Sequence, residues 1–174
     1  LGRVDRIDSI YTEKGIDAFK GEVEKLLDMK IPFYTVVNLK NFCILGDMLG
    51  GLHIFVPMPV DSLSASGDRW LLPSGAVALD GDKVETYLTY RLPEDTDADV
   101  QERYQNIMVS FFSALSEHKS AVFMKHNFPS YAEYMTSNVD SKDFYKLLSV
   151  ISEMDTEYII KQTVTGQMRT VGKE

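Results

Sequence analysis

The chain has 174 residues, 44% of them hydrophobic and 25% charged, which predicts one globular domain over residues 1–174. A formal net charge of −8 without any basic stripe argues against nucleic acid as a partner, since affinity for phosphate backbones comes from clustered Lys and Arg. No apolar run is long enough to span a membrane, and a lone cysteine, Cys43, excludes an internal disulfide and a cysteine-based zinc site.

The first predicted elements are a helix and a strand. Apolar residues recur at helical spacing from Ile16 to Leu27, with charged residues between them, which predicts an amphipathic helix. Pro32 forbids its continuation. The run 33–37 is β-branched and aromatic without polar alternation, a pattern typical of a strand that is buried on both faces.

A second helix and strand follow at once. Asn38 or Asn41 can cap a helix that ends at Gly50-Gly51, where positive φ is easily adopted. Residues 52–56 then form a strand that Pro57 stops. The strand–helix–strand order with short links favours an α/β fold, with a central mixed β-sheet flanked by helices on both faces.

The second half of the chain is predicted to be mainly helical. Residues 61–78 form a long irregular loop, and Asp80 starts a helical turn that passes into an extended segment over 88–91. Apolar residues at helical steps predict a long helix over 100–115, with Val100 and Tyr104 on its inward stripe. Further helices are expected after Pro129 and after Asp140, and residues 158–164 are expected to form a last strand.

One charged segment can carry chemistry. Arg91 and Arg103 flank an acidic loop, and two guanidinium groups near a helix N-terminus can converge on one phosphate while acidic residues hold a hard cation such as Mg²⁺. A solvated acidic loop with surface ion pairs explains the same pattern. Spacing alone leaves both explanations open.

An ordered set of short motifs resembles the LytR–CpsA–Psr cell-envelope family. The matching segments, in chain order, are Arg6-Ile7-Asp8-Ser9-Ile10-Tyr11, Ile31-Pro32-Phe33-Tyr34, Leu49-Gly50-Gly51-Leu52, Val56-Pro57, Leu79-Asp80-Gly81, Tyr87-Leu88-Thr89-Tyr90-Arg91, Glu102-Arg103-Tyr104-Gln105 and Ser137-Asn138-Val139. Each motif is weak alone, but the ordered set from about residue 6 to 166 is specific.

The resemblance implies a fold, a ligand and a place in the cell. Members of the family are α/β/α sandwiches, first described as transcriptional attenuators, that bind polyprenyl-pyrophosphate-linked glycans in an apolar tunnel and transfer them to peptidoglycan with Mg²⁺. It further implies that Arg91 and Arg103 act on the phosphate as catalytic residues and that Asp97 contributes to the metal site. The protein is then expected to be extracytoplasmic, membrane-associated through a segment outside this chain, with the family's N-terminal strands upstream of residue 1.

The departures from the family fall on the charged centre. Thr89 stands where the first arginine of a Tyr-x-Arg-x-Arg motif is expected, and Val100 and Tyr104 replace an arginine and a glutamine of an Arg-x-x-Arg-Gln motif. Two hypotheses follow. In the first, the protein is a divergent envelope protein that binds a polyprenyl-phosphate-type lipid or glycan with an incomplete phosphate site. In the second, it is an active Mg²⁺-dependent glycopolymer–peptidoglycan phosphotransferase whose remaining site residues lie upstream.

Overall fold

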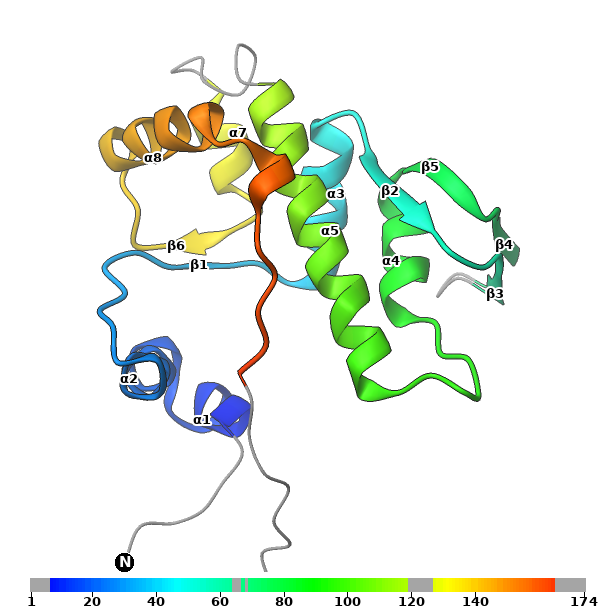
Figure 1. Cartoon of the computed structure of the whole chain (residues 1–174). Coiled ribbons are helices and arrows are strands. Elements are labelled where there is room, and N and C mark those ends of the chain that lie inside the picture. Colours follow the sequence, from blue (N-terminus) through cyan, green and yellow to red (C-terminus); the bar gives the residue numbers. More distant parts are fainter. Residues whose placement is uncertain (1–6, 64–66, 68, 119–126, 165–174) are drawn as a thin grey trace, which may run out of the picture. The chain divides into compact units, whose positions relative to one another are not determined.

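The computed structural model describes residues 7–63, 67, 69–118 and 127–164, which form helices and short strands (Figure 1). The expected α/β class is confirmed. The chain divides into two compact units, residues 1–34 with 162–174, and residues 35–161. Arg6, the first residue of the first motif, lies outside the described residues.

The smaller unit contains a pair of helices, α1 (Ile7–Lys14) and α2 (Ile16–Leu27). The amphipathic pattern predicted α2, whereas α1 was not anticipated. Glu24 joins α2 to the chain that follows it, since its carboxylate accepts hydrogen bonds from Lys20 Nζ at 2.8 Å and from the Ile31 N–H at 2.8 Å. The hydrogen bond from the Lys20 ammonium group, followed by the one from the Ile31 N–H, lowers the pKa of Glu24 to about 2.

The larger unit begins with β1 (Thr35–Val36), α3 (Leu39–Met48) and β2 (Leu52–Val56). Of the two candidate caps, Asn38 is the one that begins α3, because its side chain accepts a hydrogen bond from Asn41 N–H at 2.8 Å. Gly50 and Gly51 have φ of 85° and 97° and turn the chain directly into β2, as predicted.

The strand pairing differs from the single mixed sheet that was expected. The described strands form three two-stranded antiparallel ladders: β1 with β6 (Thr136–Ser137), β2 with β5 (Gly75–Leu79), and β3 (Val60–Leu63) with β4 (Arg69–Leu72). The short strand–helix–strand links favoured one sheet, whereas β1 and β2 lie in different ladders. Thr35 is exposed, so β1 is not buried on both faces as predicted.

Two further local predictions were wrong. The 61–78 stretch, expected to be irregular, contains the β3–β4 hairpin and the start of β5, because ladder pairing outweighs its Ser, Gly and Pro content. Residues 158–164 were expected to form a strand, but Tyr158 ends the short 3-10 helix η1 (Thr156–Tyr158), and residues 159–164 form no ladder in the described part of the chain.

The core of the larger unit lies between the β2–β5 ladder and two helices, α4 (Gly81–Thr89) and α5 (Asp97–Glu117) (Figure 1). Leu52, Ile54 and Val56 alternate inward along β2, and His53 and Phe55 face solvent. Asp80 caps α4, and Asp140 caps α8 (Ser141–Glu153), which follows the short helix α7 (Phe128–Ala132). The most deeply buried side chains are Leu49, Leu52, Val56, Val60, Leu72, Leu79, Val84, Tyr87 and Ile107.

Candidate functional site

The larger unit contains a cavity of about 660 Å³, within the range of small-molecule binding sites. Its wall comes from β1, α3, α5, α7, β6 and α8. Aliphatic and aromatic side chains dominate the lining, with five phenylalanines from four helices: Phe42, Phe111, Phe112, Phe128 and Phe144. Such a cavity suits an apolar ligand, because burial of the ligand's apolar surface removes that surface from water.

Helix α5 contributes two faces, one to the core and one to the cavity lining. Arg103, Ile107, Ser110 and Ala114 are its buried residues and recur every three or four positions. Met108, Phe111, Phe112 and Leu115 form a second stripe at the same spacing, and this stripe lines the cavity. Two sides of the helix therefore contact the protein interior, which explains why its apolar sequence pattern is unusually wide.

The β1–β6 pair provides polar groups in the cavity wall. Thr35 and Ser137, partners in this ladder, both line the cavity, and their hydroxyl oxygens lie 3.0 Å apart. Tyr131 of α7 contributes a phenol whose pKa is raised by burial, so it stays protonated. The polar contribution of these side chains is thus made by neutral hydroxyl groups.

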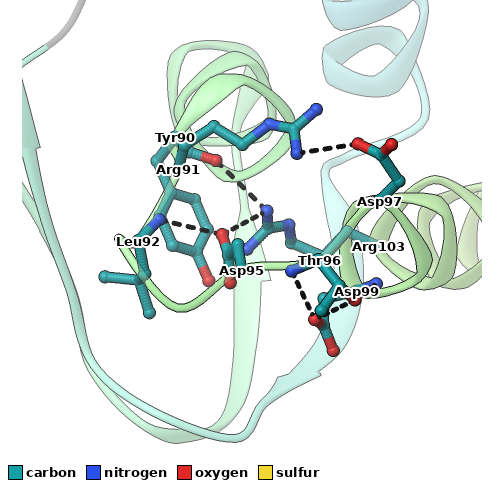
Figure 2. A network of polar contacts seen from close by, with 8 residues as sticks. All are labelled: Tyr90, Arg91, Leu92, Asp95, Thr96, Asp97, Asp99 and Arg103. Atoms are coloured by element: carbon teal, nitrogen blue, oxygen red, sulfur yellow. Dashed lines mark hydrogen bonds and ion pairs between the residues drawn. The ribbon is translucent and has the colours of Figure 1, made fainter.

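Arg103, the second predicted site residue, is enclosed near the start of α5. Its side chain is 8% exposed, as is that of Asp95, and the two form an ion pair with a distance of 2.8 Å between Nη2 and Oδ2 (Figure 2). Arg103 Nη2 also donates to the carbonyl oxygen of Tyr90 at 3.2 Å, and the guanidinium carbon lies 4.1 Å from the centre of the Tyr90 ring. Its guanidinium is therefore directed into the protein.

Arg91, the first predicted site residue, points to a different carboxylate of the same loop. Its Nη1 lies 3.5 Å from Asp97 Oδ1, and the two side chains are 54% and 99% exposed (Figure 2). The structure thus brings Arg91, Arg103 and Asp97 to one loop, but Arg91 and Arg103 bind separate partners. Arg91 offers an accessible guanidinium, which suits a phosphate oxygen.

The loop itself is fixed by the start of α5. Thr96 and Asp99 form a capping box, in which the Asp99 carboxylate accepts from Thr96 N–H at 2.7 Å and the Thr96 hydroxyl accepts from Asp99 N–H at 3.3 Å. The Thr96 hydroxyl also donates to Asp99 Oδ2 at 2.5 Å, and this hydrogen bond, followed by the one from Thr96 N–H, lowers the pKa of Asp99. Two of the acidic residues predicted as cation ligands therefore already have partners. Asp99 binds the Thr96 N–H, and Asp95 binds the Leu92 N–H and the Arg103 guanidinium.

Three replaced motif positions also take defined places. Thr89 is the last residue of α4 and not part of a strand as predicted, and its hydroxyl donates to the Glu85 carbonyl at 2.7 Å. Tyr104, predicted to face inward, is 45% exposed, and Val100 is half-buried. Neither Val100 nor Tyr104 lines the cavity. The inward face of α5 is rotated because Arg103 takes a place on it.

Magnesium does not fit the described residues by themselves. Mg²⁺ needs near-octahedral oxygen ligands, whereas the accessible Asp97 carboxylate lies beside a guanidinium. No group of three or more His, Cys, Asp or Glu side chains that could hold a metal ion occurs among residues 7–63, 67, 69–118 and 127–164.

The residues alone did not predict two features of the site, although the family resemblance implied an apolar tunnel. Asp95 was one of several loop acids, and nothing in its spacing distinguished it as the partner of Arg103. The cavity depends on helices that lie far apart in the sequence, although the wide apolar pattern of α5 was a signal for it.

None of the helices that the structure describes is both long and apolar enough to cross a membrane.

Sequence comparison relates the chain to enzymes of wall assembly. Two relatives from strains of Bacillus cereus, each named polyisoprenyl-teichoic acid–peptidoglycan teichoic acid transferase TagU, are 29% identical over 90 residues and 27% identical over 138 residues. The matches cover 52% and 78% of this chain, but only 28% and 41% of those proteins. The chain thus spans less than half the length of these relatives.

Structural comparison agrees on the fold. Bacillus subtilis TagV superposes with a TM-score of 0.81 at 20% identity, over 95% of this chain and 64% of that one. A structure of TagT bound to LI-WTA gives a TM-score of 0.68 at 18% identity, over 86% of this chain and 56% of that one. The sequence model of the LytR_cpsA_psr family matches residues 2–174. With its motifs in order, this fold and a match over nearly its whole length, the chain belongs to the LytR–CpsA–Psr family and is related to teichoic acid transferases.

Proposed function

We propose that this chain binds a polyprenyl-phosphate-type lipid, free or linked to a glycan, with the lipid chain in the cavity and the phosphate at Arg91. The apolar cavity of about 660 Å³ is the observation that carries the proposal. Its lining offers hydrocarbon and neutral hydroxyl groups, which suit an uncharged prenyl chain better than a charged group.

Helix α5 links the two parts of the proposed site. Met108, the first cavity-lining residue of α5, is five positions beyond Arg103, a rise of about 7.5 Å along the helix. Arg91 lies in the loop that Arg103 holds. Met108 and Arg103 lie on different faces of α5, so a lipid with its chain along the second half of α5 must pass around the first half of the helix to bring its phosphate to the loop before α5.

The relatives support the class of ligand and the place of action. The named activity of the TagU relatives uses polyisoprenyl-linked teichoic acid and peptidoglycan. We therefore place this chain outside the cytoplasmic membrane, where peptidoglycan is the available acceptor. In this hypothesis the phosphate site is incomplete, because Thr89, Val100 and Tyr104 supply no guanidinium or amide group.

Calorimetric titration with geranylgeranyl phosphate tests the proposal. We expect saturable binding of one molecule per chain, and at least tenfold weaker binding in Ala132→Phe, which places a ring in the cavity lining. Ala76→Phe is the matched control, because Ala76 is exposed on β5 and does not line the cavity. Absence of saturable binding, or equal affinity of Ala132→Phe and the unaltered chain, would overturn the proposal.

The second candidate is an active Mg²⁺-dependent phosphotransferase, which the printed activity of the TagU relatives favours. Incubation of the purified chain with Mg²⁺ and a polyprenyl pyrophosphate distinguishes the two. A binding protein leaves the pyrophosphate intact, as followed by ³¹P NMR, whereas cleavage that requires Mg²⁺ would show a working transferase centre within these residues.

A further inference from the structure

Arg91 lies between two residues that are both held by one enclosed ion pair. On one side, the Tyr90 carbonyl accepts a hydrogen bond from Arg103, and the Tyr90 ring lies under the same guanidinium. On the other side, the Leu92 N–H donates to Asp95 Oδ2 at 2.9 Å, and the Leu92 carbonyl accepts from Asp95 N–H at 3.1 Å. The same Asp95 Oδ2 accepts from Arg103 (Figure 2).

The ion pair is placed to hold this segment and not to meet a ligand. Both side chains are 8% exposed, and both make their charged contacts within residues 90–103. Desolvated charges with several well-placed hydrogen bonds have few alternative arrangements. Among the residues that the structure describes, the Arg91 guanidinium contacts only Asp97, at 3.5 Å, and its side chain is 54% exposed.

We propose that Arg103 and Asp95 are positioning residues, which hold the backbone on both sides of Arg91 so that its guanidinium is presented to the phosphate. The inference rests on the proposed function, since it needs Arg91 to contact an anion. Pre-organisation of this kind raises affinity by reducing the entropy that binding would otherwise cost.

The effect must act through Arg91, and that gives a sharp test. Calorimetry would give the dissociation constants of geranylgeranyl phosphate and of geranylgeraniol for the unaltered chain, Arg91→Ala, Asp95→Asn and the double variant. We expect Asp95→Asn to weaken phosphate binding about tenfold while leaving the alcohol unchanged. In the Arg91→Ala background, Asp95→Asn should cause no further loss, because the residue that it positions is gone.

Two further variants keep the result interpretable. Asp61→Asn is the control, since Asp61 is also paired with an arginine, Arg69 of the β3–β4 hairpin, and should change neither constant. Should Asp95→Asn fail to fold in circular dichroism, Tyr90→Leu replaces it. That change removes the ring under the guanidinium and leaves the ion pair.

The outcomes separate this inference from the function beneath it. If the unaltered chain binds neither ligand, or Arg91→Ala leaves phosphate binding unchanged, the proposed phosphate site is wrong and the positioning role falls with it. If Arg91→Ala weakens phosphate binding but Asp95→Asn does not, only the positioning role is overturned. The same holds if Asp95→Asn weakens both ligands alike, or adds its full effect to Arg91→Ala.

Discussion

Arg91 and Asp97 form a surface ion pair with 3.5 Å between Nη1 and Oδ1, whereas Arg103 and Asp95, in the same segment of chain, form a shorter and enclosed pair. Exposed pairs contribute little to stability, because water screens both charges. Arg91 can therefore exchange Asp97 for a phosphate at small cost. If Arg103 moved away from Asp95, the enclosed Asp95 carboxylate would be left without its charged partner, which is costly.

Removal of the Asp97 charge is expected to strengthen phosphate binding. In Asp97→Asn the guanidinium of Arg91 loses a competing anion, and affinity for geranylgeranyl phosphate should rise about two- to fivefold. Calorimetry with and without Mg²⁺ measures this. A loss of affinity that appears only with Mg²⁺ present would instead identify Asp97 as a metal ligand, the role that the family resemblance implies.

Acid is expected to remove the contribution of Asp95 to stability. The Leu92 N–H, followed by the Arg103 guanidinium, holds the pKa of Asp95 below its ordinary 3.8. A lowered pKa stabilises the folded state above the unfolded-state value, and this stabilisation is lost as the pH falls through the folded-state value. The melting temperature of the unaltered chain should thus exceed that of Asp95→Asn from pH 7 to about 5, with a gap that narrows below about pH 4. A gap independent of pH would show that Asp95 acts without its charge.

Gly51 is expected to tolerate no side chain. Its φ is +97°, and a Cβ there would lie 3.0 Å from the Leu79 carbonyl oxygen, so Gly51→Ala combines backbone strain with a collision. We expect a loss of about 2 kcal/mol or more in the free energy of unfolding. Gly75→Ala is the control, because Gly75 has φ of +108° but open space around it. Equal losses in denaturant titrations would show that the approach to Leu79 costs nothing.

Cys43 is expected to be unreactive in the folded protein. Burial, with the charge of Glu85 next in effect, raises the pKa of its thiol from 9.0 to about 11, so at pH 8 the thiolate is about a hundredfold scarcer than in an unfolded chain. Mass spectrometry after brief treatment with N-ethylmaleimide should show alkylation only in denaturant. Comparable alkylation without denaturant would contradict this burial.

Short-range signals predicted much of the local structure. The cap at Asn38, the turn at Gly50-Gly51 and the cap at Asp140 each depend on side chains within a few positions of the element that they start or end. The same is true of the amphipathic helix from Ile16 to Leu27. Such features are encoded where they occur, so a single sequence shows them.

Partners that are distant in sequence were not predicted. Thr35 pairs with Ser137, 102 positions away, and no local sequence pattern in either strand identifies the other as its pairing partner. On α5 the apolar pattern predicted that Tyr104 faces inward, whereas in the structure Arg103 is the buried residue. Its burial is possible because Asp95 pairs with its charge and the Tyr90 ring lies against its guanidinium. Periodicity cannot anticipate a buried arginine whose partners come from a preceding loop. Likewise, the cavity arises only where α3, α5, α7 and α8 meet.

Native mass spectrometry of the chain mixed with a polyprenyl phosphate tests the central claim most directly, because it counts the lipid molecules held by each protein molecule. We expect one retained lipid per chain, which is still bound in Ala76→Phe and is lost in Ala132→Phe. Retention of no lipid, or a lipid adduct of equal abundance in Ala132→Phe, would contradict the proposed binding in the cavity.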